Sequence, residues 1–258
     1  MTAVVLNGIE LRTIGDGAPR FVFFHGCPTT VDVMDDIAAQ LPGASVCVSS
    51  PGYGKSPAMP GPMRLDALHQ RLEDALVLAG AVDAWLVGFS AGAYHALALA
   101  GRPALRVRGV TTLGGLLALG DDERAGFRQL ADALEAGADL RPIAGPRFLS
   151  EKFRALHPER VADVERWLTA TPRENLVAEL RGFADAPDLT ERVHTLSIPV
   201  VARVGAVDLA SPVPKSEAIA RAARNGRLEV VEGAGHALPY EDQDGVVRSL
   251  SGSSAGGV

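Results

Sequence analysis

The chain has 258 residues, of which 47% are apolar and 22% are charged, and its formal net charge is −6. This is an ordinary globular composition, long enough for one large α/β domain or for a core domain with an insertion. The negative net charge argues against a positively charged surface patch of the kind that binds nucleic acid or anionic membranes, so we expect neither as a partner. Two cysteines, Cys27 and Cys47, are too few for a disulfide framework. They are interpreted as reduced thiols, which favours a cytoplasmic protein.

The first predicted element is a β-hairpin, with strands over 4–6 and 10–13 separated by Asn7-Gly8. Strands and helices then alternate. Short apolar strands are predicted over 21–24, 45–48, 84–87 and 107–113, and amphipathic helices over 31–41, 65–78 and 91–100. Because parallel neighbours need a crossover connection, this rhythm predicts an α/β fold with a mostly parallel, doubly wound sheet.

The alternation stops at Asp121. Only helices are predicted from there to about 186, most clearly over 121–134, 158–168 and 172–183. It resumes with strands over 199–204 and 228–231 and a helix over 216–223. We therefore divide the chain into a core of 1–120 and 187–250, a helical cap of 121–186, and a Gly/Ser-rich tail of 251–258 that is expected to be disordered.

The central motif is Gly88-Phe89-Ser90-Ala91-Gly92, placed between the strand over 84–87 and the helix over 91–100. A serine on so sharp a strand–helix turn is held in a strained conformation, and the residues two before and two after it must be small. Gly88 and Gly92 meet that demand. Ser90 is therefore the predicted nucleophile, and a plain turn with a serine cap is the alternative.

A serine hydroxyl needs a base, and His236 is the best placed of six histidines. It lies in Gly233-Ala234-Gly235-His236, just after the last predicted strand, at the carboxyl edge of a parallel sheet where Ser90 also lies. Asp208 follows the strand over 199–204 and is the predicted acid that orients the imidazole. Asp121 and Asp122 are rivals for that role, but they are farther from a strand end.

An oxyanion hole needs two backbone N–H groups. Ala91, the residue after the nucleophile, should supply one, and Cys27 in the loop His25-Gly26-Cys27-Pro28 should supply the other, since Pro28 has no N–H. His25 is interpreted mainly as a brace of this loop. Substrate contacts are further assigned to His25, Phe89, Phe148 and Trp167. Two or three apolar cap residues are expected to line the pocket, from the set Phe127, Leu130, Phe148, Phe153, Trp167, Leu168 and Phe183.

These motifs resemble the α/β-hydrolase superfamily over nearly the whole chain. The order Ser90, Asp208, His236 matches that family's order of nucleophile, acid and base. The stretch from Ser50 to Ser56 is similar to its D-x-P-G-x-G-x-S loop, with Ser49 where the aspartate is expected, so a bracing hydrogen bond should be made differently. The insertion resembles the family's helical cap. A serine nucleophile argues against dehalogenases and epoxide hydrolases, which use aspartate.

The predicted function is a serine hydrolase that acts on a small-molecule ester or related acyl substrate through an acyl-enzyme, without metal or organic cofactor. A C–C bond hydrolase and a cofactor-independent oxygenase or perhydrolase on the same triad are alternatives, because one fold hosts many chemistries. A non-catalytic ligand receptor is a third. The sequence leaves the substrate and the oligomeric state open.

Overall fold

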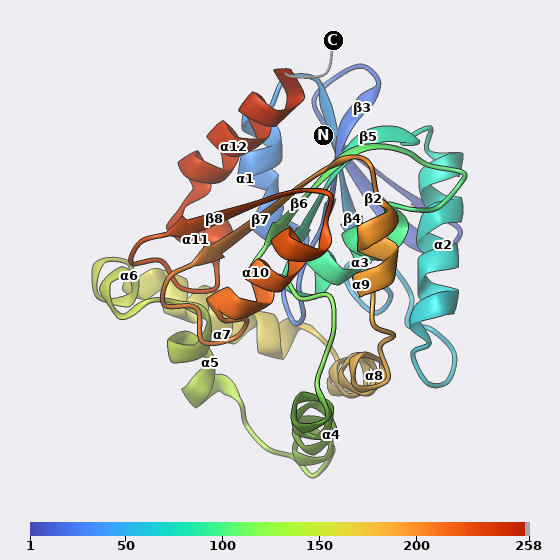
Figure 1. Ribbon diagram of the computed structural model, residues 1–258. Coiled ribbons are helices and arrows are strands. Elements are labelled where there is room, and N and C mark those ends of the chain that lie inside the picture. The colour runs from blue at the N-terminus through green and yellow to red at the C-terminus, as the bar shows by residue number, and fades with distance from the viewer. Residues whose placement is uncertain (256–258) are drawn as a thin grey trace.

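The computed structural model describes residues 1–255 as one eight-stranded sheet with helices on both faces (Figure 1). The strands lie in the order β1-β2-β4-β3-β5-β6-β7-β8. Their bounds are β1 Thr2–Leu6, β2 Ile9–Ile14, β3 Pro19–Phe24, β4 Ala44–Ser49, β5 Asp83–Phe89, β6 Arg106–Leu113, β7 Pro199–Gly205 and β8 Asn225–Val231. The strands from β3 to β8 pair in parallel, while β1 and β2 pair antiparallel, so the predicted mostly parallel sheet is confirmed.

The N-terminal hairpin is also confirmed. Asn7 and Gly8 form its two-residue turn, with φ of 49° and 72°. Positive φ at both central residues is what a type I′ turn requires, and asparagine followed by glycine tolerates it best. The hairpin adds β2 antiparallel to β4, where Glu10 pairs with Ser49.

Alternating side chains of each central strand supply two separate cores. Val22 and Phe24 of β3 point to one face, with the buried side chains of α2 and α3, while Phe21 and Phe23 point to the other, with those of α1. Figure 1 shows α1 and α12 on one side of the sheet and α2, α3, α9 and α10 on the other. The core helices are α1 Asp32–Gln40, α2 Leu65–Leu78, α3 Ala91–Leu99, α9 Thr190–Thr195, α10 Val213–Ala222, α11 Leu238–Glu241 and α12 Gln243–Ala255.

Between β6 and β7, the five helices that precede α9 lie together beyond one edge of the sheet (Figure 1). They are α4 Asp121–Glu135, α5 Arg141–Phe148, α6 Glu151–Leu156, α7 Pro158–Ala170 and α8 Arg173–Ala184. Helices α4 and α8 pack against each other, as do α5 and α7. The sequence pattern did not predict α5 and α6, because both are short and α5 contains the helix-breaking Pro146.

The C-terminus differs from the prediction of a disordered tail over 251–258. Helix α12 continues to Ala255, and residues 256–258 lie outside the described residues. Val246 and Leu250 of α12 are fully buried in the core that contains α1. Their burial stabilises the helix, although Gly and Ser are poor helix formers. Among residues 1–255, no helix is long and apolar enough to cross a membrane.

Candidate active site

Ser90 is the single residue between β5 and α3, and its backbone has a conformation that few residues adopt. Its φ is 54° and its ψ is −120°. A Cβ at Gly88 would lie 2.3 Å from the carbonyl oxygen of Gly92, and one at Gly92 would lie 2.2 Å from that of Phe24. Neither position can carry a side chain, as the sequence argument required. A strained backbone held by such close packing is characteristic of functional positions.

His236 and Asp208 form a fully buried pair after β8 and β7. The His236 Nδ1 atom lies 2.7 Å from Asp208 Oδ2, and the two side chains are 1% and 0% exposed. The backbone N–H groups of Ala210 and Ser211 both donate to Asp208 Oδ1 at 2.8 Å. The acid is therefore fixed by two donors on one oxygen and faces the imidazole with the other. Asp121 and Asp122, the rival acids, are exposed at the start of α4.

The other imidazole nitrogen is unoccupied. His236 Nε2 is buried and has no hydrogen-bond partner among the described residues. Since Asp208 accepts from Nδ1, the proton is assigned to Nδ1 and Nε2 keeps its lone pair. The rings of Phe89 and Phe148 pack on His236, with centroids 5.0 and 5.4 Å away. A buried base is thus held in one tautomer and one orientation.

Gly114, at the end of β6, makes room for this pair. Its φ is 58°, and a Cβ there would lie 2.8 Å from His236 Nδ1 and 2.9 Å from Asp208 Oδ2. The sequence argument missed this residue, because Gly114-Gly115 after a strand also fits an ordinary loop. Its position in the sheet could have identified it. Gly114 follows the carboxyl end of β6, and β6 lies between β5, which leads to Ser90, and β7, which leads to Asp208.

The loop after β3 lies directly against Ser90. A Cβ at Gly26 would be 2.7 Å from the Cβ of Ser90. The backbone N–H of Cys27 donates to no group within residues 1–255. Ala91 is the first residue of α3, so its N–H has no intrahelical acceptor. Both predicted oxyanion donors therefore have free N–H groups beside Ser90.

A cavity of about 450 Å³ contains these groups and extends under the inserted helices. Ser90, His236, Cys27 and Ala91 lie at its core end. The rest of the lining is mostly apolar: Leu116, Leu119, Phe127, Leu130, Leu134, Leu140, Ile143, Ala144, Phe148, Leu168, Leu176, Leu180 and Phe183. Five of the seven cap residues considered from sequence line it, more than the two or three expected.

Of the four predicted substrate contacts, only Phe148 lines this cavity. The prediction needs correction for the other three. Phe89 is fully buried beneath His236, and Trp167 packs between Phe148 and Tyr240. His25 accepts from the N–H of Ser50 at Nε2, 3.0 Å away, and donates from Nδ1 to the Gly26 carbonyl at 2.8 Å. Burial lowers the pKa of His25 to about 4, so it is a neutral brace of the loop.

The missing aspartate at position 49 is replaced by Glu10 of the neighbouring strand. Glu10 Oε2 accepts from Ser49 Oγ at 3.1 Å and from the Lys55 N–H at 2.7 Å. Ser56 Oγ accepts from the Glu10 N–H and donates to the Ser49 carbonyl, both at 2.7 Å. The loop over 50–56 is thus braced by a carboxylate from β2, which sequence spacing could not place because Glu10 is 39 residues away from Ser49.

Charged groups are few in the cavity. Glu123 of α4 and Lys215 of α10 form an ion pair of 2.5 Å across it. Arg147 is exposed and forms no ion pair or hydrogen bond with any residue of 1–255. No group of three or more His, Cys, Asp or Glu side chains in the described part of the chain could hold a metal ion.

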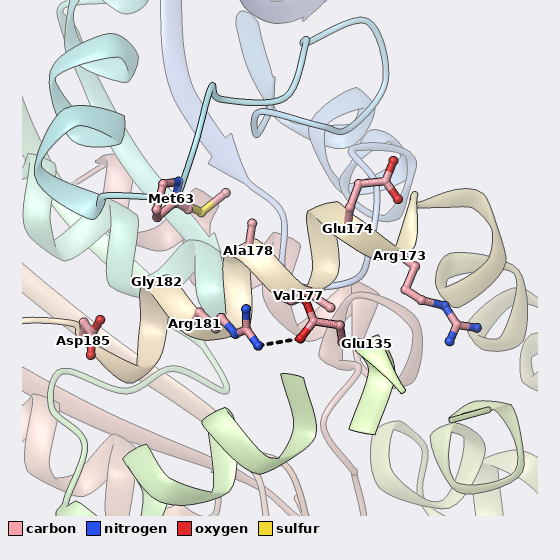
Figure 2. A pocket seen from close by; sticks show the side chains of 10 residues that line it. Met63, Glu135, Arg173, Glu174, Val177, Ala178, Arg181, Gly182 and Asp185 are labelled. Atoms are coloured by element: carbon pink, nitrogen blue, oxygen red, sulfur yellow. Dashed lines mark hydrogen bonds and ion pairs between the residues drawn. The ribbon is translucent and has the colours of Figure 1, made fainter. Parts of the chain in front are cut away.

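A second hollow, of about 490 Å³, lies on another face of α8 and contains none of the predicted site residues. Figure 2 shows Val177, Ala178 and Arg181 of α8 along it, with Met63 from the segment before α2 opposite. The dashed line marks the ion pair of 2.7 Å between Arg181 and Glu135, a residue of α4. The candidate active site is therefore the cavity that contains Ser90.

Comparisons with known proteins agree with this architecture. A 2-succinyl-6-hydroxy-2,4-cyclohexadiene-1-carboxylate synthase of Salmonella paratyphi C (strain RKS4594) is 27% identical over 242 residues, which are 91% of this chain and 93% of that protein. A thermophilic esterase of Thermogutta terrifontis, solved with malate, superposes with a TM-score of 0.87 at 25% identity, covering 96% of this chain and 94% of the esterase. The enol-lactonase of Burkholderia xenovorans LB400 shares the fold, with a TM-score of 0.85 at 21% identity over 98% of this chain and 100% of that one. The alpha/beta hydrolase family model matches residues 21–249, and the chain belongs to that family.

Proposed function

We propose that the protein hydrolyses carboxylic esters of small molecules that carry an apolar acyl group, with Ser90 as nucleophile. The observation that carries this proposal is the buried His236. Its Nδ1 is fixed by Asp208, while its Nε2 has no partner within residues 1–255 and shares a cavity with Ser90. A buried, unpartnered ring nitrogen is costly unless it has a proton to accept.

The proposed reaction has two steps. Ser90 Oγ attacks the carbonyl carbon while His236 Nε2 takes its proton, and the N–H groups of Cys27 and Ala91 stabilise the oxyanion. The imidazolium then gives the proton to the leaving alcohol, which leaves an ester on Ser90. Water repeats the sequence with His236 as base and releases the acid. Asp208 holds the tautomer and stabilises the cation throughout.

The apolar lining supports the choice of acyl group. Helices α4 and α8 contribute Phe127, Leu130, Leu176, Leu180 and Phe183 to the cavity, so it favours hydrocarbon over a strongly hydrated group. The esterase of Thermogutta terrifontis, at 25% identity, is consistent with the same reaction class.

A second candidate is a reaction on a carboxylate-bearing substrate with His236 as the base. The synthases at 27–28% identity are named for a carboxylate product. The observation that favours this candidate is Arg147, a cation in the lining with no ion-pair partner among residues 1–255. An unpaired guanidinium can bind a carboxylate through two parallel hydrogen bonds.

Labelling and turnover together test both candidates. A fluorophosphonate should label the wild-type enzyme on Ser90 and should not label Ser90→Ala, which should also lose on the order of 10⁴–10⁶ in kcat. Hydrolysis of p-nitrophenyl acetate, butyrate and octanoate should be compared with that of p-nitrophenyl hemisuccinate. A preference for the apolar esters supports the first candidate. A preference for hemisuccinate that Arg147→Gln abolishes supports the second, and unchanged turnover in Ser90→Ala rules out Ser90 as the nucleophile.

A further inference from the structure

One carboxyl group of the cap is buried and has no cation beside it. Glu179 of α8 is 3% exposed and forms no ion pair with any residue of 1–255. Burial raises its pKa. Its neighbours on the helix, Leu176 and Leu180, line the cavity, whereas Glu179 lines neither hollow. Burying a carboxyl group without a cation beside it lowers the stability of the fold, and an apolar side chain at this position would avoid that loss. The polar contacts of Glu179 therefore require an explanation.

The contact that Glu179 makes is with the core. Tyr53, in the loop after β4, donates its hydroxyl to Glu179 Oε2 at 2.5 Å. The tyrosine is 2% exposed, and its ring packs edge-on against His25, with centroids 4.6 Å apart. His25 in turn bonds the Gly26 carbonyl, the group immediately before the N–H of Cys27. A continuous path therefore runs from the cap to the proposed oxyanion donor.

The side chain of Cys27 lies at the same cluster. Burial raises the pKa of its thiol, and the nearby carboxyl of Glu179 raises it further, whereas the Tyr53 hydroxyl acts in the opposite direction. Cys27 also lines the cavity. The proposed oxyanion residue is thus enclosed from both sides, by His25 and Gly26 along the backbone and by Glu179 and Tyr53 around its side chain.

A second polar link joins the same helix to the same loop without reaching Cys27. The Asn175 amide of α8 donates to the Gly52 carbonyl at 2.8 Å. Asn175 is also buried, at 8% exposure, and it lies one helical turn from Glu179. It therefore provides a matched control for cap docking alone.

We propose that Glu179 is a positioning residue, which holds the Cys27 loop in place from the cap through Tyr53. The proposal rests on the function proposed above, since it concerns the donor geometry of that reaction. It implies that the cap takes part in the chemistry as well as in the choice of substrate. A donor that is displaced costs less than one that is deleted, and deletion of an oxyanion donor costs about 10²–10³ in kcat.

The first test separates kcat from KM with a short ester, whose binding depends little on the cap. We expect Glu179→Leu to lower kcat by about 10–100-fold with KM nearly unchanged, and Glu179→Gln, whose amide oxygen can still accept from Tyr53, to recover most of that loss. Tyr53→Phe should lower kcat similarly, and the Glu179→Leu/Tyr53→Phe double variant should lose no more kcat than either single variant.

Asn175→Leu should lower the melting temperature with a smaller effect on kcat. An equal loss of kcat in Asn175→Leu and Glu179→Leu overturns the inference.

The second test does not depend on turnover. Iodoacetamide should alkylate Cys27 and spare the fully buried Cys47. Because Glu179→Leu removes the acceptor that holds the loop through Tyr53, it should change the alkylation rate of Cys27 at one fixed pH, whereas Asn175→Leu should stay near the wild-type rate. Unchanged alkylation, with wild-type labelling of Ser90 intact, overturns this inference alone. Failure of the phosphonate to label the wild type overturns the proposed function.

Discussion

The two walls of the cavity are built in different ways. On the sheet side, Ser90, Asp208 and His236 are fixed by backbone: a strained turn, two N–H donors on one carboxylate oxygen, and glycines where any Cβ would collide. On the cap side, the lining is apolar side chains, and few polar bonds tie the helices to the core. The first wall leaves little room for change in the positions of these three side chains. The second can change its shape by single substitutions in its apolar lining. Apart from the proposed role of Glu179, chemistry and substrate choice are therefore expected to separate between the walls.

The largest effect should come from the sheet side. Asp208→Asn keeps the hydrogen bond but favours the wrong imidazole tautomer, so kcat should fall by about 10³–10⁴ while the fold is retained. Steady-state kinetics and circular dichroism measure the two outcomes. Asp121→Asn and Asp122→Asn, at exposed positions of α4, serve as controls. A larger loss in either control would show that the acid has been misassigned.

On the cap side, truncation should alter selectivity instead of chemistry. Phe127→Ala and Leu130→Ala should change the ratio of kcat/KM for octanoate over acetate esters by about 1–3 kcal/mol each at most, while phosphonate labelling of Ser90 persists. Phe153→Ala is the matched control, since Phe153 of α6 packs on His157, which follows that helix, and does not line the cavity. If all esters slow equally in the two cap variants, the cap wall acts as a brace and the contrast between the walls fails.

A third effect is a loss of stability in acid, caused by two buried histidines between α2 and α3, in the core behind the sheet-side wall. His69 Nε2 and His95 Nδ1 lie 3.1 Å apart between α2 and α3, and burial lowers the pKa of His69 to about 3. The unfolded chain binds protons at these histidines below about pH 6.5 while the folded one does not, so stability should be lost as pH falls from 6.5 toward 3. Each histidine contributes at most about 1.4 kcal/mol per pH unit in that window.

Urea unfolding at pH 7 and pH 5 measures this effect. The free energy of unfolding should fall less between the two pH values in His69→Gln than in the wild type. His157→Gln, at a half-exposed position, should match the wild type. If the free energy of unfolding falls equally in His69→Gln and in the wild type between pH 7 and pH 5, the His69–His95 pair does not destabilise the fold in acid.

The smallest effect is expected where the two walls meet. Cys27→Ala keeps the backbone N–H that the oxyanion needs and removes only the thiol beside Glu179, so acylation by a small ester should slow by less than about 10-fold. Stopped-flow measurement of the first turnover tests this. A loss of 10³ or more in a folded variant would mean that the thiol itself takes part in the reaction.

The sheet-side wall was predictable from sequence because its residues follow strand ends. Ser90, Asp208 and His236 each come just after an apolar run, and parallel strands bring their carboxyl ends to one edge. The cap wall was only partly predictable. Helical periodicity identifies apolar residues such as Phe127, Phe148 and Trp167, but it does not distinguish those that face the cavity from those that face another helix. The contacts of Glu10, Asn175 and Glu179 with the loop over 49–56 could not be predicted. Each joins residues far apart in the chain, and only the loop end belongs to a motif.

The carboxylate of Glu10 has a consequence for the extent of the working unit. The N-terminal hairpin precedes residue 21, where the family model begins to match, and it forms the outer edge of the sheet. Yet its second strand carries the carboxylate that braces the loop over 50–56, and the Ser50 N–H of that loop donates to His25, close to the proposed oxyanion donor. The region that the family model matches and the unit that supports this loop therefore do not begin at the same residue. An N-terminal truncation designed to the family boundary would remove a support of the loop over 50–56 along with an edge strand.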